Sequence, residues 1–275
     1  MAVDLHVHST ISDGTQTPEE IVAAATQQGL HAISITDHDH VGAVALAQRA
    51  AGDGLLVLPG VEVSTELRAT EVHILGYMID VQNAALLAKL AEVRDSREWR
   101  AREMVKRLNG LGVDVSYEQV AQTAGAGSVG RPHLARLLHD RGFVVSQQDA
   151  FRRYLRKGGP AYVPRHKLAP VEALALIRQA GGAAVLAHPG LCRDDAVVRE
   201  AIETGIDGVE AYHTDHTDVE TDRYLHMAAE YGLLVTGGTD SHGPEGPIPV
   251  EIGSVDVPDR AAAALVAWAR QNTVA

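Results

Sequence analysis

Two histidines separated by one residue, His6 and His8, lie near the start of the chain in the segment VDLHVH, residues 3–8. Side chains alternate between the two faces of a strand, so both imidazoles would project from one face with their origins about 7 Å apart. Two histidines on one face can bind a metal ion. The spacing alone is weak evidence, because an isolated H-x-H is more often a pair of surface histidines.

Further polar residues lie inside apolar segments or directly after them: Asp13, His38, Glu62, His73, His188, Asp240 and His242. With the first pair they supply six imidazoles, three carboxylates and no cysteine. This donor set is typical of a divalent ion such as Mn, Zn or Fe. Because a four-coordinate ion uses about four ligands, the set predicts two or three ions that share bridging carboxylates.

Each residue of this set has an ordinary explanation when taken singly, since a buried histidine such as His73 is more often a hydrogen-bonded core residue than a ligand. The whole set is harder to explain in that way. Each unpaired polar group in an apolar strand would cost about 1–3 kcal/mol, so many of them together would destabilise the fold. The combination therefore predicts a metal site.

The segments that must position these residues alternate between strand and helix. Strands are expected at 31–36, 55–64, 72–77, 183–187, 208–212, 233–236 and near Ile252. Several end next to a histidine or an acid of the set. Seven or so strands alternating with helices predict an α/β fold, a (β/α) barrel whose site lies at the carboxyl ends of its strands.

This alternation stops between residues 83 and 167, where apolar residues recur with a helical period. We therefore predict a barrel formed by residues 1–82 and 168–275, interrupted by a helical insertion over 83–167. Residues 131–167 include nine Lys or Arg and two acids, although the formal net charge of the chain is −12. Such a segment is either a solvated helix face or a surface that binds an anion.

The composition limits which classes of protein are possible. The 275 residues include one cysteine, Cys192, which excludes a disulfide within the chain and is interpreted as an incidental thiol. No export signal is evident, and no apolar run approaches the roughly 20 residues of a membrane span. We expect a cytoplasmic protein that does not bind a membrane, and no obligate protein partner is evident.

Five motifs resemble the signature of the polymerase and histidinol phosphatase (PHP) family: Asp4-Leu5-His6-Val7-His8, Ile35-Thr36-Asp37-His38-Asp39, Gly60-Val61-Glu62-Val63-Ser64, Ala187-His188-Pro189 and Gly238-Thr239-Asp240-Ser241-His242. The resemblance covers the chain outside the insertion. It implies a distorted seven-stranded (β/α) barrel that holds a trinuclear metal centre.

The resemblance also implies ligands for each ion. The first ion would bind His6, His8, Glu62 and Asp240. The second would share Glu62 and add His73 and His188, and the third would bind Asp13, His38 and His242. The third site of the family often has a histidine where this chain has Asp13.

The insertion is similar to that of stand-alone PHP phosphoesterases, through an Arg-bearing helix at 94–102 and the motif Gly130-Arg131-Pro132-His133. Those enzymes remove the 3′-phosphate of nucleoside 3′,5′-bisphosphates or trim short RNA from its 5′ end. We expect a small nucleotide or short oligonucleotide as substrate. Because arginine can bind phosphate through two parallel hydrogen bonds, the residues expected to hold its distal phosphate are Arg97, Arg100, Arg131 and His133.

The expected reaction is phosphoester hydrolysis, in which a hydroxide that bridges two divalent ions attacks phosphorus in line. Manganese is the first choice of ion, with zinc or iron as alternatives. His213 or His216 would protonate the leaving oxygen. Asp37 is included in the catalytic group as a residue that orients a metal-bound imidazole, and Asp39 is a candidate for the same role.

Three other functions stay open at this point. A 5′–3′ exoribonuclease would use the same residues on a longer substrate. A histidinol-phosphate phosphatase would use the same metal centre, but its monophosphate substrate gives less reason for an Arg-rich insertion. A non-catalytic metal-binding partner module, as PHP domains attached to polymerases can be, is disfavoured because all nine ligand positions are filled.

Overall fold

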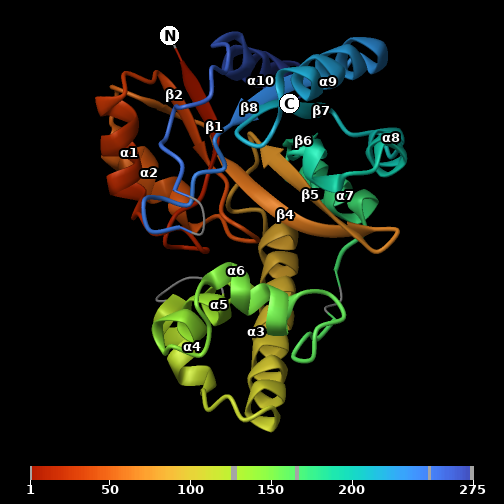
Figure 1. Ribbon diagram of the computed structural model, residues 1–275. Helices are drawn as coiled ribbons and strands as arrows, with labels where there is room; N and C mark the ends of the chain where they lie inside the picture. The colour runs from red at the N-terminus through yellow and green to blue at the C-terminus, as the bar shows by residue number, and fades with distance from the viewer. Residues whose placement is uncertain (1, 125–128, 165–166, 247–248, 273–275) are drawn as a thin grey trace.

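The strands of the protein form two sheets at the centre of the fold (Figure 1). The computed structural model describes residues 2–124, 129–164, 167–246 and 249–272. Within these ranges the strands are β1 (Val3–Val7), β2 (Ala32–Ile35), β3 (Leu56–Val57), β4 (Gly60–Leu67), β5 (Thr70–Tyr77), β6 (Ala183–Leu186), β7 (Gly208–His213) and β8 (Leu234–Gly238).

The two sheets are joined at their edges. One sheet has the order β1-β2-β3 and is parallel, and the other has the order β4-β5-β6-β7-β8. Isolated parallel bridges link Val7 to Ser241, beyond the end of β8, and His38, beyond the end of β2, to Glu62 on β4. The strands therefore surround one central space, and the segments that follow β1, β2, β6 and β8 meet above it.

The strands differ from the sequence-based expectation in three places. The stretch 55–64 is two strands, β3 and β4, because Pro59 between them has no N–H to donate to a sheet. β5 is antiparallel to both of its neighbours, β4 and β6, so the barrel is not built wholly of parallel strands. No strand forms near Ile252, because Gly253 has a φ of +78° and turns the chain.

The helices cover the outside of the strands and also form a separate group beside them (Figure 1). Those that cover the strands are α1 (Pro18–Gln27), α2 (Gly42–Ala51), α7 (Pro170–Gln179), α8 (Asp195–Glu203), α9 (Asp218–Tyr231) and α10 (Arg260–Asn272). The 3₁₀ helix η2 (Pro189–Cys192) follows β6. Among the described residues, no helix combines the length and apolar character needed to cross a lipid bilayer.

The separate group lies between β5 and α7 in the chain. It consists of α3 (Ala84–Gly110), α4 (Tyr117–Ala124), α5 (Arg131–Asp140), α6 (Gln147–Ala150) and the π-helix η1 (Phe151–Leu155). The first half of α3 packs through Leu86 and Leu90 against the apolar core of the strands. Its second half packs through Met104 and Leu108 into a different apolar core, shared with α4 and α5. The long helix α3 therefore connects the two cores.

Close backbone contact between β1 and β8 fixes the position of the first two histidines. A Cβ atom added to Gly238 would lie 2.4 Å from the backbone nitrogen of His6 and 2.5 Å from its Cβ. Only glycine fits there without a shift of one strand. The glycine on β8 thus allows β1, at the edge of the first sheet, to lie against β8, at the edge of the second sheet.

We predict that Gly238→Ala lowers the free energy of unfolding by about 1–3 kcal/mol or more, because neither backbone can move aside without disturbing its sheet. Urea unfolding followed by circular dichroism measures the change. Gly110→Ala is the matched control, since a Cβ there meets nothing within 4 Å. Its stability should stay level or rise by up to about 1 kcal/mol. Equal stabilities for the two variants would contradict the steric argument.

Candidate metal centre

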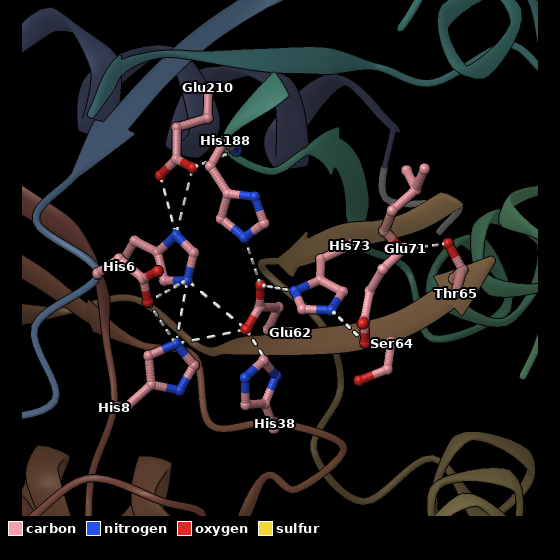
Figure 2. A network of polar contacts seen from close by, with 12 residues as sticks. His6, His8, His38, Glu62, Ser64, Thr65, Glu71, His73, His188 and Glu210 are labelled. Carbon is pink, nitrogen blue, oxygen red and sulfur yellow. Dashed lines mark hydrogen bonds and ion pairs between the residues drawn. The ribbon is translucent and has the colours of Figure 1, made fainter. Parts of the chain in front are cut away.

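The carboxylate of Glu62, on β4, lies at the centre of four imidazoles and is completely buried (Figure 2). Its Oε2 atom is 2.7 Å from His38 Nδ1 and 3.3 Å from His8 Nε2. Its Oε1 atom is 2.7 Å from His73 Nδ1 and 3.0 Å from His188 Nε2. These residues come from five separate segments of the chain, and one carboxylate brings them together.

Asp240 and Asp13 complete the cluster on either side of His8. Asp240 Oδ1 is 2.9 Å from His8 Nε2 and 3.3 Å from His6 Nε2. Asp13 Oδ1 is 3.5 Å from His242 Nε2. All nine residues that the sequence suggested as ligands therefore lie in one continuous cluster.

Ligand atoms that lie within 4.8 Å of one another form several groups that could hold an ion. Four of them contain only residues of the predicted set: His8, Asp13, His38 and His242; His6, His8 and Asp240; His6, Glu62 and His188; and His38, Glu62 and His73. His73 and His188, expected to share an ion, fall in different groups that both contain Glu62. The number of groups is consistent with more than one ion.

Several buried atoms in the cluster lie close to a neighbouring donor or acceptor but form no hydrogen bond of good geometry among the described residues. They include Asp13 Oδ1, His38 Nδ1, Glu62 Oε2 and Asp240 Oδ1. An unsatisfied buried group costs about 1–3 kcal/mol, so four in one place need compensation. Imidazole nitrogens and carboxylate oxygens are suitable donors for divalent Mn, Zn or Fe. The residues present therefore fit a metal centre.

Sequence reasoning missed Glu210, on β7. Its Oε1 atom is 3.0 Å from Nδ1 of His6, and its Oε2 accepts the backbone N–H of His188 at 2.7 Å. A carboxylate that accepts the Nδ1–H of an imidazole leaves the Nε2 lone pair for a metal. Glu210 therefore orients His6. The signal was an acid in an apolar strand, which is the pattern that had identified Glu62.

The hydrogen bonds of His213 give it a different role from the ligands. Its Nδ1 accepts the backbone N–H of Asp215 at 3.1 Å, so the proton of the neutral ring is on Nε2. That atom points into the cluster, 3.7 Å from Asp240 Oδ2. A protonated Nε2 has no lone pair for a metal. His213 thus faces the centre with an Nε2–H that has no hydrogen-bond partner among the described residues, and the ring also falls in a group of potential ligands with His6 and Glu210.

His216 does not share this arrangement. Its Nδ1 lies 2.9 Å from the carbonyl oxygen of Ala211, and its Nε2 accepts the backbone N–H of Gly190 at 3.1 Å. Both ring nitrogens are therefore used by the backbone. The expectation that His216 is an alternative proton donor is wrong, because both ring nitrogens already hold η2 to β7.

Asp37 lies beside the cluster without touching an imidazole. Its Oδ1 accepts hydrogen bonds from the backbone N–H of Ser9 at 2.7 Å and the hydroxyl of Ser12 at 2.6 Å. Its Oδ2 accepts the hydroxyl of Ser9 at 2.6 Å. Ser12 Oγ in turn lies 3.5 Å from Nδ1 of His8, so these contacts connect Asp37 to an imidazole through one hydroxyl, and its orienting role stays a prediction. Asp37 also orders the loop that leads to Asp13.

Opposite charges shift the pKa values of the metal-free cluster. Burial alone would lower the pKa of His73, but the carboxylates of Glu62 and Glu71 outweigh it and raise that pKa to about 9. Burial would also lower the pKa of His242, but the carboxylates of Asp13 and Asp240 outweigh burial and raise that pKa to about 10. At neutral pH both rings carry a proton that a metal ion must displace.

A cavity of about 200 Å³ separates the cluster from the helical group. Asp13, His38 and His73 contribute to its lining. The lining also includes Arg97 and Arg100 of α3 and Arg131 of α5. Three of the four residues expected to hold a distal phosphate thus line the same cavity as three of the predicted metal ligands.

His133 and Arg97 differ from that simple expectation. His133 does not line this cavity, and its Nδ1 accepts the backbone N–H of Gly130 at 3.0 Å. It lies on a second cavity of about 210 Å³, which also reaches Asp13. Arg97 is partly buried and pairs with Asp39 Oδ2 at 2.7 Å. Asp39 thus holds an arginine of the helical group.

Comparison with known proteins agrees with this geometry. Residues 4–157 match the family model described as the PHP domain. The chain belongs to the PHP family. It is a metal-dependent phosphoesterase, and the TIM-like barrel of the PHP fold accounts for the closed arrangement of its strands.

Curated relatives span nearly the same length as this PHP chain. It is 34% identical over 249 residues to the 5′-3′ exoribonuclease Rnm of Escherichia coli, covering 88% of the chain and 85% of the relative. It is also 34% identical over 249 residues to the 3′,5′-nucleoside bisphosphate phosphatase of Chromobacterium violaceum, covering 88% and 87%. A phosphoribosyl 1,2-cyclic phosphate 1,2-diphosphodiesterase of Eggerthella lenta is 31% identical over 255 residues, covering 90% and 97%.

The fold also matches a solved structure of a protein described as a metal-dependent phosphoesterase, from Bifidobacterium adolescentis. The TM-score is 0.88 at 30% sequence identity, and the match covers 96% of this chain and 95% of the other. The likeness therefore includes the helical group between β5 and α7 as well as the strands.

We predict that Mn²⁺ uptake at pH 7 releases protons from His73 and His242, because their pKa values of about 9 and 10 lie above that pH. Affinity should therefore rise between pH 6 and pH 9. Isothermal titration calorimetry in buffers of different ionisation enthalpy measures the proton release. A control variant at exposed His226 should leave it unchanged. Heats that do not depend on the buffer would disprove the prediction.

Proposed function

We propose that the protein is a manganese-dependent phosphatase that removes the 3′-phosphate of nucleoside 3′,5′-bisphosphates. The observation that supports the proposal is one cavity lined both by predicted metal ligands and by three arginines. A substrate with two phosphates could place one phosphate at the metal ligands and the other at the arginines. The similarity to a 3′,5′-nucleoside bisphosphate phosphatase supports this choice.

The arginines differ in how well they could receive the distal phosphate. Arg97 already pairs with Asp39, so much of its charge is compensated. Arg100 donates its Nε–H to the carbonyl of Val163 at 2.7 Å, which holds the guanidinium in the cavity wall. Arg131 begins α5 and contacts Glu71 at 3.2 Å on the cavity side. We assign Arg100 and Arg131 the main contacts with the 5′-phosphate and Arg97 a supporting one.

Residues of this chain also account for the reaction itself. Divalent ions bound by the nine ligands would polarise the phosphoryl oxygens and lower the pKa of a coordinated water. Glu210 keeps His6 in the tautomer that binds metal. His213 presents its Nε2–H toward the centre, where it can donate to the leaving 3′-oxygen. Asp37 supports the loop that carries Asp13.

We further propose that residues 83–167 are a substrate-binding cap on a barrel made of 1–82 and 168–275. The separate apolar core of the helical group supports this division. In the barrel, we interpret β1, β2 and β4 to β8 as the seven-stranded ring, with the two-residue β3 as an addition beside β2.

A 5′–3′ exoribonuclease is the second candidate, and the second cavity favours it. That cavity shares Asp13 with the first and is lined also by Gln122, Gln147 and Arg136. A nucleoside attached beyond the scissile phosphate could extend into it.

The candidates are separated by initial rates on three substrates: adenosine 3′,5′-bisphosphate, a 5′-phosphorylated dinucleotide and histidinol phosphate. Metal content is measured on the same protein, purified without chelator. Histidinol phosphate as the best substrate would overturn the proposal.

We predict that Arg131→Ala lowers kcat/KM for adenosine 3′,5′-bisphosphate by about 10- to 100-fold, the loss expected for a charge-assisted pair of about 1.5–3 kcal/mol. Turnover of p-nitrophenyl phosphate should change less than threefold, because that substrate has no distal phosphate. Arg152→Ala is the matched control, since Arg152 is on the same helical group but pairs with Asp149 outside the cavity. Equal losses on both substrates would refute the cap assignment.

We predict that His213→Gln lowers kcat for the bisphosphate by about 100-fold or more, the range typical of a lost proton donor. The loss on p-nitrophenyl phosphate should be small, because its leaving group needs no proton. Metal content must match that of the unchanged protein, as His213 is not a ligand. A similar loss on both substrates would exclude His213 as the donor.

A further inference from the structure

Glu71, on β5, lines the cavity and contacts both a predicted metal ligand and two cations. Its Oε1 is 3.4 Å from His73 Nε2 and 2.8 Å from Lys167 Nζ. Its Oε2 is 3.2 Å from the guanidinium of Arg131. Figure 2 shows Glu71 on the side of His73 that faces away from Glu62. One carboxylate therefore links the histidine cluster to an arginine expected to bind phosphate.

The contact with His73 sets which nitrogen can bind metal. The Nδ1 atom of this ring lies 2.7 Å from Glu62, inside the cluster. The Nε2 atom is directed at Glu71, so a proton placed there is hydrogen-bonded. A carboxylate that accepts one ring N–H keeps the other nitrogen as a ligand and makes it a better donor. Glu71 would serve His73 as Glu210 serves His6.

The contact with Arg131 has the opposite consequence for substrate binding. Arg131 lines the cavity, and a carboxylate on its guanidinium occupies a position that a phosphate oxygen would take. The negative charge of Glu71 also repels an incoming phosphate dianion. Removing that charge should therefore strengthen phosphate binding, while it weakens the support of His73.

We propose that Glu71 is a positioning residue that strengthens metal binding through His73 and holds Arg131 until a phosphate displaces it. The part about Arg131 rests on the proposed function of the cap. The part about His73 requires only the metal centre. The two parts predict effects of opposite sign in one variant, which a merely structural role would not produce.

The test uses Glu71→Gln, which keeps the size of the side chain and removes its charge. Calorimetry with Mn²⁺ should show an affinity about 10- to 100-fold lower, as expected for a lost orienting carboxylate. Binding of adenosine 5′-monophosphate to the metal-free protein should become about fivefold tighter, since a partly exposed ion pair contributes up to about 1 kcal/mol. Glu71 is 42% exposed, so the variant should fold, and its thermal unfolding serves as a check.

Glu66→Gln is the matched control. Glu66 is the cross-strand neighbour of Glu71 and shares Lys167 with it, at 3.9 Å, but no hydrogen bond or ion pair of the described residues joins Glu66 directly to His73 or Arg131. Both affinities should stay within about twofold of the unchanged protein, as for other exposed pairs.

Unchanged Mn²⁺ affinity in Glu71→Gln would overturn the role toward His73. Weaker nucleotide binding in this variant would show that Glu71 prepares Arg131 for phosphate. It would overturn the proposal that phosphate displaces Glu71 from Arg131. If the unchanged protein does not bind adenosine 5′-monophosphate, the cap assignment fails and the displacement fails with it. Lack of bisphosphate turnover, with these binding results intact, would instead count against the proposed substrate alone.

Discussion

The structure depends on the enclosure of Glu62, a carboxylate with no exposed surface, among imidazoles. Removing such a charge from water costs several kcal/mol unless opposite charge or metal replaces the lost hydration. In the metal-free chain burial opposes ionisation, but His38, His73 and His6 hold the pKa of Glu62 well below its usual range. The same negative charge makes the pocket attractive to divalent cations. Stability of the centre and its chemistry thus have one electrostatic origin.

Two residues of the cluster have positive φ angles, which residues other than glycine rarely adopt. His188 has a φ of 25° and Asp240 a φ of 52°, and each follows the end of a strand. Strain of this kind costs about 1–3 kcal/mol per residue and is found most often at functional sites. Hydrogen bonds fix both residues, because His188 N–H donates to Glu210 and Asp240 N–H donates to the carbonyl of His6. The strain turns both side chains toward the central space.

The segment 131–167, most of which lies in the helical group, supplies positive charge to a chain whose formal net charge is −12. Arg94 and Arg97 donate hydrogen bonds to Asp39, and so connect α3 to the loop that carries His38 of the cluster. A movement of the helical group relative to the strands would therefore shift this loop. The helix α3, which is anchored in both apolar cores, brings Arg97 and Arg100 to the cavity that His38 and His73 also line.

The sequence by itself determined the types and order of the residues that form the cluster, because a polar residue inside an apolar strand is conspicuous and the alternation of strand with helix implies where it will lie. That reasoning found His6, His188 and Glu62, and the same signal was present, but not used, for Glu210. Tertiary structure decided what depends on contacts between distant segments. The pairing of Arg97 with Asp39 and the antiparallel pairing of β5 with β6 are set by partners far away in the chain. No local pattern carries that information, because hydrogen bonds of this kind exist only after the strands and the helical group have packed together.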